Sequence, residues 1–370
     1  MFLPHASVTE ILSAAATLNV SPGDTLMVLV AEHNAPDLDE LRNALRQTIP
    51  RFFGGIFPAV LSGARAHDEG AVILALPALE PPRVCAVSAR AGPSGADLAL
   101  PTADPCTAVL LADGMSPGIS EFLAGVFRQL GPATHCVGGG AGVSAMVQRP
   151  CVFTAEGVFD NAAVMAFAPW RCSLGVQHGM KRLVGPIVAT RTRQNIIEEL
   201  NWRPALEVYK AIVERDTGQP LTAENFYDSG RAWAYPFGLV REGAEDVVRD
   251  PLAVVDHGIR CAGGVPENTA LHVLKGDADH LIAAARRAGE RAAAGARSRP
   301  RAALICDCVS RRMFLKGRFA EELSAVSAAL RPIDHLEPEG MLTIGELSSS
   351  GESVLDFYNK TIVVGLLCDA

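Results

Sequence analysis

The sequence predicts a mixed α/β protein of the α+β type, with more than one sheet and with short strands and helices in two domains. Short apolar runs bounded by polar residues, Gly or Pro recur along the chain, as buried strands do. Apolar residues at helical spacing lie between some of these runs. The 370 residues exceed a typical domain of roughly 100–200 residues, and 34 Gly with 24 Pro predict many turns.

Six apolar runs have the length and the boundaries of buried strands. They are residues 26–31, 71–76, 108–112, 162–168, 302–306 and 361–367. A helix does not follow every one of them, and residues 151–197 look like consecutive strands and turns. We therefore expect mixed sheets rather than a purely parallel one.

Four segments have the periodicity of amphipathic helices. They are residues 37–49, 120–130, 318–330 and a segment that begins at Pro204. In the first of them Leu38, Leu41 and Leu45 share one face, and Asp37 is placed to cap the first turn. Pro204 suits the first residue of a helix, where an N–H would have no partner.

A polar segment divides the chain near residue 220. Residues 214–225 contain Gly218 and Pro220 and no apolar periodicity, as linkers do. We therefore predict one domain over residues 1–220 and a second over residues 221–370.

Composition excludes several classes of protein. The net charge of −8 argues against sequence-independent binding to nucleic acid, which needs a basic surface. The longest apolar runs reach about eight residues, whereas a membrane-spanning helix needs about 20. The N-terminus lacks the basic region of a signal peptide. Nine irregularly spaced Cys residues predict free thiols in a reducing cytoplasm.

Two motifs in the middle of the chain each allow two interpretations. The run Gly138-Gly139-Gly140-Ala141-Gly142 either brings backbone N–H groups close to a ligand or forms a tight turn between strands. His178 follows an apolar run and precedes a glycine. Its neutral imidazole either binds a ligand, metal or haem or makes an ordinary hydrogen bond in a loop.

Polar motifs near the C-terminus lie beside predicted strands. Cys308 and Arg311 follow the strand at residues 302–306 and precede a helix, which is where α/β folds place binding sites. The arginine suits a carboxylate, and the thiol beside it suits a thiolate; buried thiols and solvated arginines are the alternative. Glu346 and Asn359 flank apolar segments and are individually compatible with turns.

In their order along the chain, these segments resemble the FIST family of bacterial sensory proteins. The resemblance covers roughly residues 25 to 367. It is carried by GGGAG at 138–142, GVQHG at 175–179, the segment 185–209, FGLVRE at 237–242, CDCVSRR at 306–312, IGEL at 344–347 and YNKT at 358–361.

The resemblance implies a soluble ligand-binding sensory protein rather than a known catalyst. It implies amino acids as ligands, or haem and nitric oxide in some members. It also implies a histidine kinase, a cyclic-dinucleotide enzyme or a chemotaxis protein as the separate partner. The implied ligand-binding residues are Gly139, Gly140, Gly142, His178, Arg241, Cys308, Arg311, Glu346, Asn359 and Thr361.

Two positions depart from the family pattern. Val143 stands where an acidic residue often follows the glycines, which puts a ligand contact there in doubt. Met180 stands after His178-Gly179, where an arginine is usual.

Three hypotheses for function follow from these residues. In a sensor of amino-acid-like molecules, Arg311 binds the carboxylate, Glu346 the ammonium group and Asn359 either of them. In a haem sensor, His178 is the first candidate for the axial ligand and Cys308 the second. In a thiol-dependent enzyme, Cys308 is the nucleophile. For each we expect residues 138–142, 178 and 308–361 to converge on one cleft.

Overall fold

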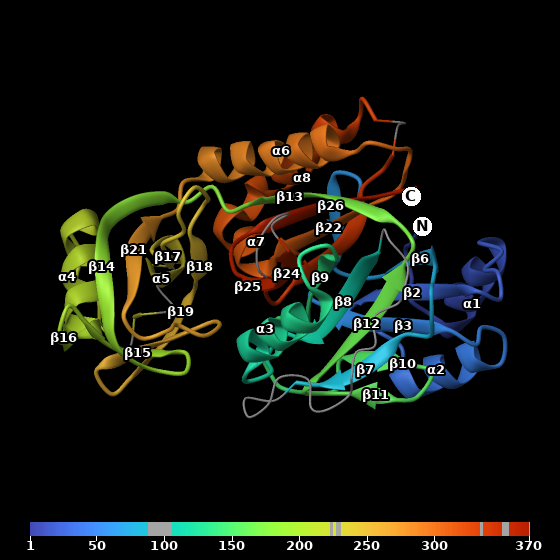
Figure 1. Ribbon diagram of the computed structural model, residues 1–370, viewed down its shortest axis with the longest axis horizontal. Helices are drawn as coiled ribbons and strands as arrows, with labels where there is room; N and C mark the ends of the chain where they lie inside the picture. The colour runs from blue at the N-terminus through green and yellow to red at the C-terminus, as the bar shows by residue number, and fades with distance from the viewer. Residues whose placement is uncertain (88–105, 223–224, 227–230, 334–335, 350–354, 370) are drawn as a thin grey trace.

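The computed structural model describes residues 1–370 except 88–105, 223–224, 227–230, 334–335, 350–354 and 370. The described residues form two lobes (Figure 1). The larger lobe contains the described residues up to 177 and, after the smaller lobe, helix α6 (Ala278–Gly295) and the described residues that follow it. The smaller lobe contains the described residues of 181–275. The mixed α/β class predicted from the sequence is confirmed.

Three mixed six-stranded sheets build the larger lobe. The first has the order β1 (Phe2–Leu3), β6 (Ala71–Pro77), β2 (Asp24–Ala31), β3 (Phe52–Phe57), β10 (Val152–Thr154), β11 (Val158–Phe159). The second has the order β25 (Leu355–Tyr358), β24 (Glu346–Ser349), β9 (His135–Ala141), β8 (Thr107–Asp113), β12 (Ala162–Ala168), β7 (Arg83–Ala86). The third has the order β13 (Arg171–Gln177), β26 (Ile362–Cys368), β22 (Pro300–Cys308), β23 (Glu339–Thr343), β4 (Val60–Ser62), β5 (Arg65–His67).

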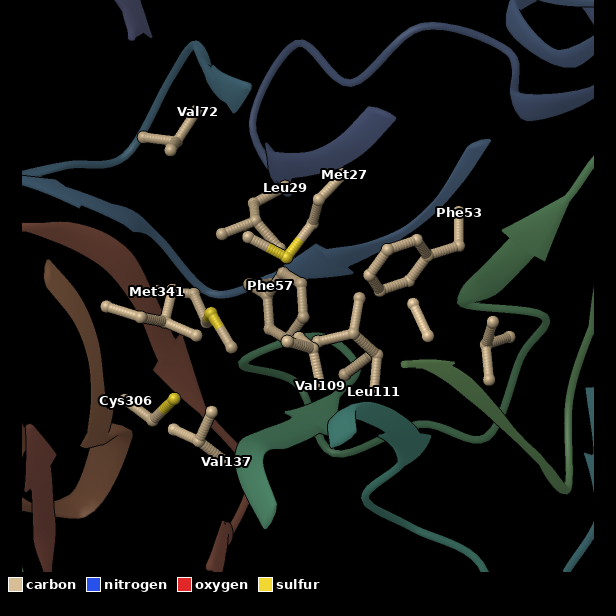
Figure 2. Close-up of a cluster of buried hydrophobic side chains, with 14 of the residues drawn as sticks. Met27, Leu29, Phe53, Phe57, Val72, Val109, Leu111, Val137, Cys306 and Met341 are labelled. Atoms are coloured by element: carbon tan, nitrogen blue, oxygen red, sulfur yellow. The ribbon is translucent and has the colours of Figure 1, made fainter. Parts of the chain in front are cut away.

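The three sheets share one central core, to which each contributes one face (Figure 2). Successive side chains of a strand point to opposite faces. Met27 and Leu29 of β2 therefore enter this core, together with Val109 of β8 and Cys306 of β22. The opposite faces pack against helices. They are α1 (Val8–Thr17) and α2 (Leu38–Arg46) on the first sheet, α3 (Ile119–Leu130) on the second, and α6 and α8 (Phe319–Leu330) on the third.

The smaller lobe is an eight-stranded sheet with two helices. Its order is β18 (Val247–Arg249), β17 (Phe237–Leu239), β21 (Thr269–Lys275), β14 (Lys181–Arg193), β15 (Ile196–Leu200), β20 (Gly258–Cys261), β19 (Pro251–Val255), with β16 (Arg203–Pro204) paired to β15. Helix α4 (Ala205–Thr217) packs its apolar face on this sheet, and α5 (Arg231–Ala234) lies nearby.

The boundary predicted near residue 220 does not coincide with the boundary between the lobes. Strand β14 precedes this residue and pairs with β21, which follows it, so residue 220 lies inside the smaller lobe. Residues 214–217 are the last turn of α4 rather than a linker. The chain instead crosses between the lobes twice, at residues 178–180 and 276–277.

The individual elements follow the sequence closely. All six predicted strands and all four predicted helices are present, with shifted ends. Asp37 caps α2, where its Oδ1 accepts a hydrogen bond of 2.9 Å from the Glu40 N–H. Pro204 precedes the first helical residue instead of being it. Periodicity did not reveal α1, or the full length of α6.

Two further expectations can be compared with the described residues. All nine Cys residues are free, as predicted, and all nine are buried. Within the described ranges, no helix is long and apolar enough to cross a membrane.

Candidate functional site

A cavity of about 1020 Å³ lies between the two lobes. The larger lobe contributes the turn after β8, the segment after β9 and the start of α7 (Val309–Leu315) with the 3-10 turn Lys316–Arg318 beyond it. The smaller lobe contributes residues 194–195, 250, 252–253 and 260–264. A volume of this size accommodates a drug-sized organic molecule.

The cavity lies at the carboxyl ends of two pairs of parallel strands. Strands β8 and β9 run parallel and end at Asp113 and Ala141, and the segments that follow them line the cavity. Strands β22 and β23 are also parallel, and Cys308 and Ile344 line the cavity at their ends. Ligands of α/β proteins bind at such strand ends, as the sequence analysis expected for Cys308.

Most of the cavity wall is apolar. Three methionines line it, Met115, Met146 and Met313, and they come from segments far apart in the sequence. Ile119 and Phe357 are two further examples of its apolar side chains. Methionine is flexible and polarisable, so a wall of this kind adapts to ligands of different shape. No spacing in the sequence indicated that these three residues would meet.

Three buried polar side chains in the wall each have an atom without a hydrogen-bond partner among the described residues. They are Ser116 (Oγ), Asp250 (Oδ1) and Asn359 (Oδ1), which are only 5%, 5% and 3% exposed. Asp250 lies in the smaller lobe and the other two in the larger. Buried polar atoms are nearly always hydrogen-bonded, so an unpaired group at a cavity wall indicates a place for a ligand or water.

The two lobes are tied together beside this cavity. Arg249 donates hydrogen bonds of 2.9 Å to the Phe357 carbonyl of the larger lobe and of 2.8 Å to the Gly264 carbonyl of its own lobe. The Gly264 N–H donates to Ser120 Oγ of α3 at 3.1 Å. Arg241 forms an ion pair with Asp356 across the same boundary. Arg241, expected as a ligand contact, thus joins the lobes and does not line the cavity.

Of the ten residues expected to bind a ligand, the structure brings two into the cavity wall, Cys308 and Asn359. Glu346, Thr361 and Arg311 lie close behind that wall, buried and bonded to other protein groups. The expectation that all of these motifs line one cleft is therefore only partly met. Ser116 and Asp250, which do line it, carried no motif in the sequence.

Arg311 is fully buried, and all five of its N–H groups have protein acceptors. Two of them donate to the Glu322 carboxylate at 2.9 and 2.8 Å. The other three donate to the carbonyls of His178 (2.7 Å), Lys360 (2.8 Å) and Leu281 (3.1 Å). No donor remains for a ligand carboxylate, and Arg311 does not line the cavity. The residue instead holds together the first crossing between the lobes, helix α6 and the segment after β25.

Glu346 belongs to a hydrogen-bond chain that suits a protonated carboxyl group. Thr343 Oγ1 lies 2.7 Å from Glu346 Oε1 and 3.1 Å from the Asp307 carbonyl, and the Thr361 N–H donates to Glu346 Oε2 at 3.1 Å. The single hydroxyl proton of Thr343 can serve both contacts only if Glu346 donates to Thr343. Burial raises the pKa of Glu346 to about 8, in agreement with this arrangement.

This raised pKa predicts a pH effect on stability. Because the folded pKa lies above the unfolded one, the contribution of Glu346 is fully present below about pH 4.5 and is lost as the pH rises towards 8. Glutamine reproduces the hydrogen bonds of the protonated acid and does not titrate. As the pH rises from 5 to 8, the free energy of unfolding of Glu346→Gln should increase relative to that of the wild type by at least about 2 kcal/mol, as measured by urea unfolding. Parallel pH profiles for the two proteins would contradict this.

The glycine run is part of a strand. Gly138, Gly139 and Gly140 lie in β9 between β8 and β24, not in a turn or a ligand loop. A Cβ at Gly139 would overlap the Thr343 methyl group, and one at Gly140 would overlap the Ile344 carbonyl. The run therefore allows two backbones to lie close together. Gly142 follows the strand at a φ of +148°, and none of the three expected glycines lines the cavity.

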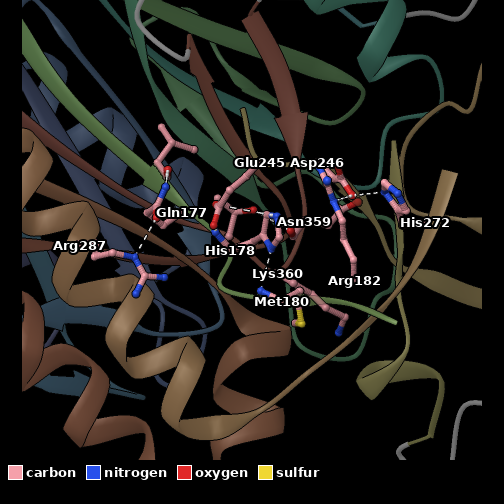
Figure 3. Close-up of polar contacts among 12 residues, drawn as sticks. Gln177, His178, Met180, Arg182, Glu245, Asp246, His272, Arg287, Asn359 and Lys360 are labelled. Atoms are coloured by element: carbon pink, nitrogen blue, oxygen red, sulfur yellow. Dashed lines mark hydrogen bonds and ion pairs between the residues drawn. The ribbon is translucent and has the colours of Figure 1, made fainter. Parts of the chain in front are cut away.

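His178 lies outside the cavity wall in a polar cluster (Figure 3). Its Nδ1 accepts a hydrogen bond of 2.8 Å from the Met180 N–H, so the proton of the neutral ring is on Nε2, which lies 3.8 Å from Glu245. Burial lowers the pKa of His178. Neither ring nitrogen therefore presents a free lone pair, and the site does not fit an axial haem ligand.

A neighbouring cluster carried no signal in the sequence. Asp246 accepts hydrogen bonds from Arg182 at 2.7 and 3.2 Å and lies 2.7 Å from His272 Nδ1 (Figure 3). These contacts fix the start of β14 to its neighbours. In the described part of the chain, no three His, Cys, Asp or Glu residues are arranged to hold a metal ion.

Cys308 has the environment of an inert thiol. Its Sγ lies 3.1 Å from Ser310 Oγ, and burial raises the pKa of the thiol to about 12. Reactive cysteines instead have a lowered pKa beside a histidine or another cation. At neutral pH Cys308 is therefore a protonated thiol and not the thiolate that nucleophilic catalysis needs.

Two α/β lobes that enclose a cavity at the ends of parallel strands define the general class of this protein. The chain belongs to the FIST family: residues 25–203 match the FIST N domain and residues 205–349 match the FIST C domain. FIST domains are generally sensory domains of signal transduction. The comparison with curated proteins gave no match.

Proposed function

We propose that the chain is a cytoplasmic sensor whose signal molecule binds in the cavity between the lobes. One observation supports this above all: side chains from both lobes that line one large, mainly apolar cavity each carry a buried polar atom without a hydrogen-bond partner among the described residues. A ligand there touches Asp250 of the smaller lobe and Asn359 of the larger lobe at once. Binding energy then depends on how the lobes are placed, so the ligand shifts their arrangement.

In this proposal the signal passes to a separate protein. The FIST family suggests a histidine kinase, a cyclic-dinucleotide enzyme or a chemotaxis protein as that partner. The change originates at the two crossings between the lobes. Arg311 holds the first of them through the His178 carbonyl and contacts α6, the helix that follows the second, through the Leu281 carbonyl. A partner that contacts both lobes would detect it.

An amino acid is the ligand that the family suggests, but this cavity favours it less. The two groups expected to bind its charges, Arg311 and Glu346, are engaged inside the protein. Haem is not favoured either, because His178 presents no free nitrogen and the Cys308 thiol is protonated.

Blocking the cavity tests the proposal. Ala253 lies on β19 in the cavity wall, and tryptophan at this position would occupy part of the volume. Purified wild type is first screened against a metabolite library by thermal shift, since a ligand that binds only the folded state raises the Tm. We expect compounds that stabilise the wild type to lose this effect in Ala253→Trp.

Ala270→Trp is the matched control, because Ala270 is half-buried in the same lobe but does not line the cavity. Both variants must retain the wild-type circular dichroism spectrum. Compounds that stabilise Ala253→Trp as strongly as the control would place their binding site elsewhere and contradict the proposal.

The chemistry of Cys308 separates the sensor from a thiol-dependent enzyme. With a pKa of about 12, the thiol should react with iodoacetamide at pH 7.5 at least ~100-fold more slowly than an ordinary exposed cysteine. Ser324→Cys on the exposed face of α8 supplies that reference within the same chain. Labelling is followed by peptide mass spectrometry. Equal rates at the two positions would restore the enzyme hypothesis.

A further inference from the structure

We infer that the cavity ligand combines an apolar body with an uncharged group that donates hydrogen bonds, received by Asp250, Asn359 and Ser116. This inference rests on the proposed function and names the class of ligand. It differs from the zwitterion that the sequence suggested, and it follows from the arrangement of the cavity wall.

The unpaired atoms of the wall require donors. Asp250 Oδ1 and Asn359 Oδ1 only accept hydrogen bonds, and Ser116 Oγ can accept as well as donate. The other atoms of these side chains have contacts in the protein: Asp250 Oδ2 lies 2.9 Å from Lys360 Nζ, and Asn359 Nδ2 donates to the Tyr358 carbonyl at 3.0 Å. A hydroxyl or amide N–H on the ligand supplies what the wall lacks.

The charges around these acceptors favour a neutral ligand group. Asp250 is already matched by Lys360, which is itself only 1% exposed. An ammonium group would bring a second buried cation close to Lys360, and a carboxylate would face the Asp250 oxygen. Either change leaves a buried charge poorly compensated, which costs more than it gains.

The remaining charged groups of the wall do not alter this conclusion. Arg312 is paired with Asp68, and Glu121, Arg260 and Lys316 are exposed to solvent. The positive end of α3 also faces the cavity, but Glu121 in its first turn offsets it.

The body of the ligand is expected to be apolar and larger than one amino acid. The cavity is about 1020 Å³, at the upper end of the range for sites that bind drug-sized molecules. Its methionine side chains, together with Ile119 and Phe357, offer dispersion contacts and few polar ones.

Four probes with one apolar body and different polar groups test the inference. They are 2-naphthol, 2-methoxynaphthalene, 2-naphthoate and 2-naphthylmethylammonium, titrated into the full chain and followed by ligand-observed NMR. We expect 2-naphthol to bind about tenfold more tightly than each of the others, the difference that one buried hydrogen bond makes.

Variants locate the preference. Ser116→Ala and Asn359→Leu should each reduce the advantage of 2-naphthol over 2-methoxynaphthalene. Ser327→Ala is the matched control, because Ser327 Oγ is also buried without a partner but lies on α8, away from the cavity wall. This control should keep the wild-type ratio, and a ratio that falls equally in all three variants would overturn the assignment.

The outcomes distinguish the inference from the proposed function. If none of the four probes binds, the ligand class is overturned, while the sensor proposal is decided separately by the screen with Ala253→Trp. If the probes bind in the cavity with equal affinity, or the charged ones bind best, the sensor proposal stands and the ligand class is wrong.

Discussion

Replacing Arg311 with methionine is expected to lower the free energy of unfolding by about 3–5 kcal/mol. The substitution removes a fully buried guanidinium and leaves the Glu322 carboxylate without its two hydrogen bonds. It also frees three backbone carbonyls, and Asp307, 3.4 Å from Arg311 Nε, loses its nearest cation. The free energy of unfolding of Arg311→Lys should lie between those of the wild type and Arg311→Met, because lysine keeps the charge but not the planar set of five donors. Urea unfolding measures both.

The neighbouring residue provides the control. Arg312 forms an ion pair with Asp68 on the half-exposed surface, and such pairs contribute about 0–1 kcal/mol. Arg312→Met should therefore leave the unfolding midpoint almost unchanged. If Arg311→Lys instead kept full stability and lost only ligand binding, the carboxylate clamp expected from the sequence would be correct after all.

The difference between these two arginines shows where sequence analysis reaches its limit. Residue type and local pattern placed Arg311 after the strand at residues 302–306 and before the helix at 318–330, but both arginines lie within the short helix α7, which periodicity did not predict. Type and pattern did not reveal that the His178 carbonyl, 133 residues away along the chain, would reach Arg311, or that the nearby Glu322 would turn inward to pair with it. Burial of an arginine is a tertiary property, and it decides between a ligand contact and a structural one.

The same limit applies to the cavity. Cys308 could be placed near a site because it follows an apolar strand, and ligands of α/β proteins bind at the carboxyl ends of such strands. Asn359 entered through the family resemblance. Asp250 and Ser116 carried neither signal, because the cavity that they line forms only where the two lobes meet. The family models divide the chain between residues 203 and 205, inside the smaller lobe, so sequence families and structural lobes do not share a boundary here.

The predicted strands succeeded for a physical reason. A strand buried on both faces must be apolar at every position, and this pattern is local. β2 illustrates it: Met27 and Leu29 enter the central core while Leu26 and Val28 contact the helices. The glycines of β9 break this rule, because their role is to let another backbone approach, and a run of glycine is as typical of a turn.

The glycine strand leads to the last prediction. Gly138→Ala should prevent folding, at a cost of more than about 4 kcal/mol, because the new Cβ would overlap the backbone of Leu110 on the paired strand β8. Gly139→Ala should cost less, about 1–3 kcal/mol, because the obstacle is the methyl group of the Thr343 side chain.

A second substitution separates the two cases. Thr343→Ser removes the methyl group and keeps the hydroxyl that contacts Glu346 and the Asp307 carbonyl. It should recover much of the stability lost in Gly139→Ala and none of that lost in Gly138→Ala, as measured by urea unfolding of the double variants. Equal recovery in both would show that the glycines are required for the flexibility of β9 and not for close packing. Recovery in the Gly139→Ala variant alone would instead establish that β9 needs glycine where the segment around Thr343 packs against it. This contact lies directly behind the cavity wall at Ile344 and Cys308.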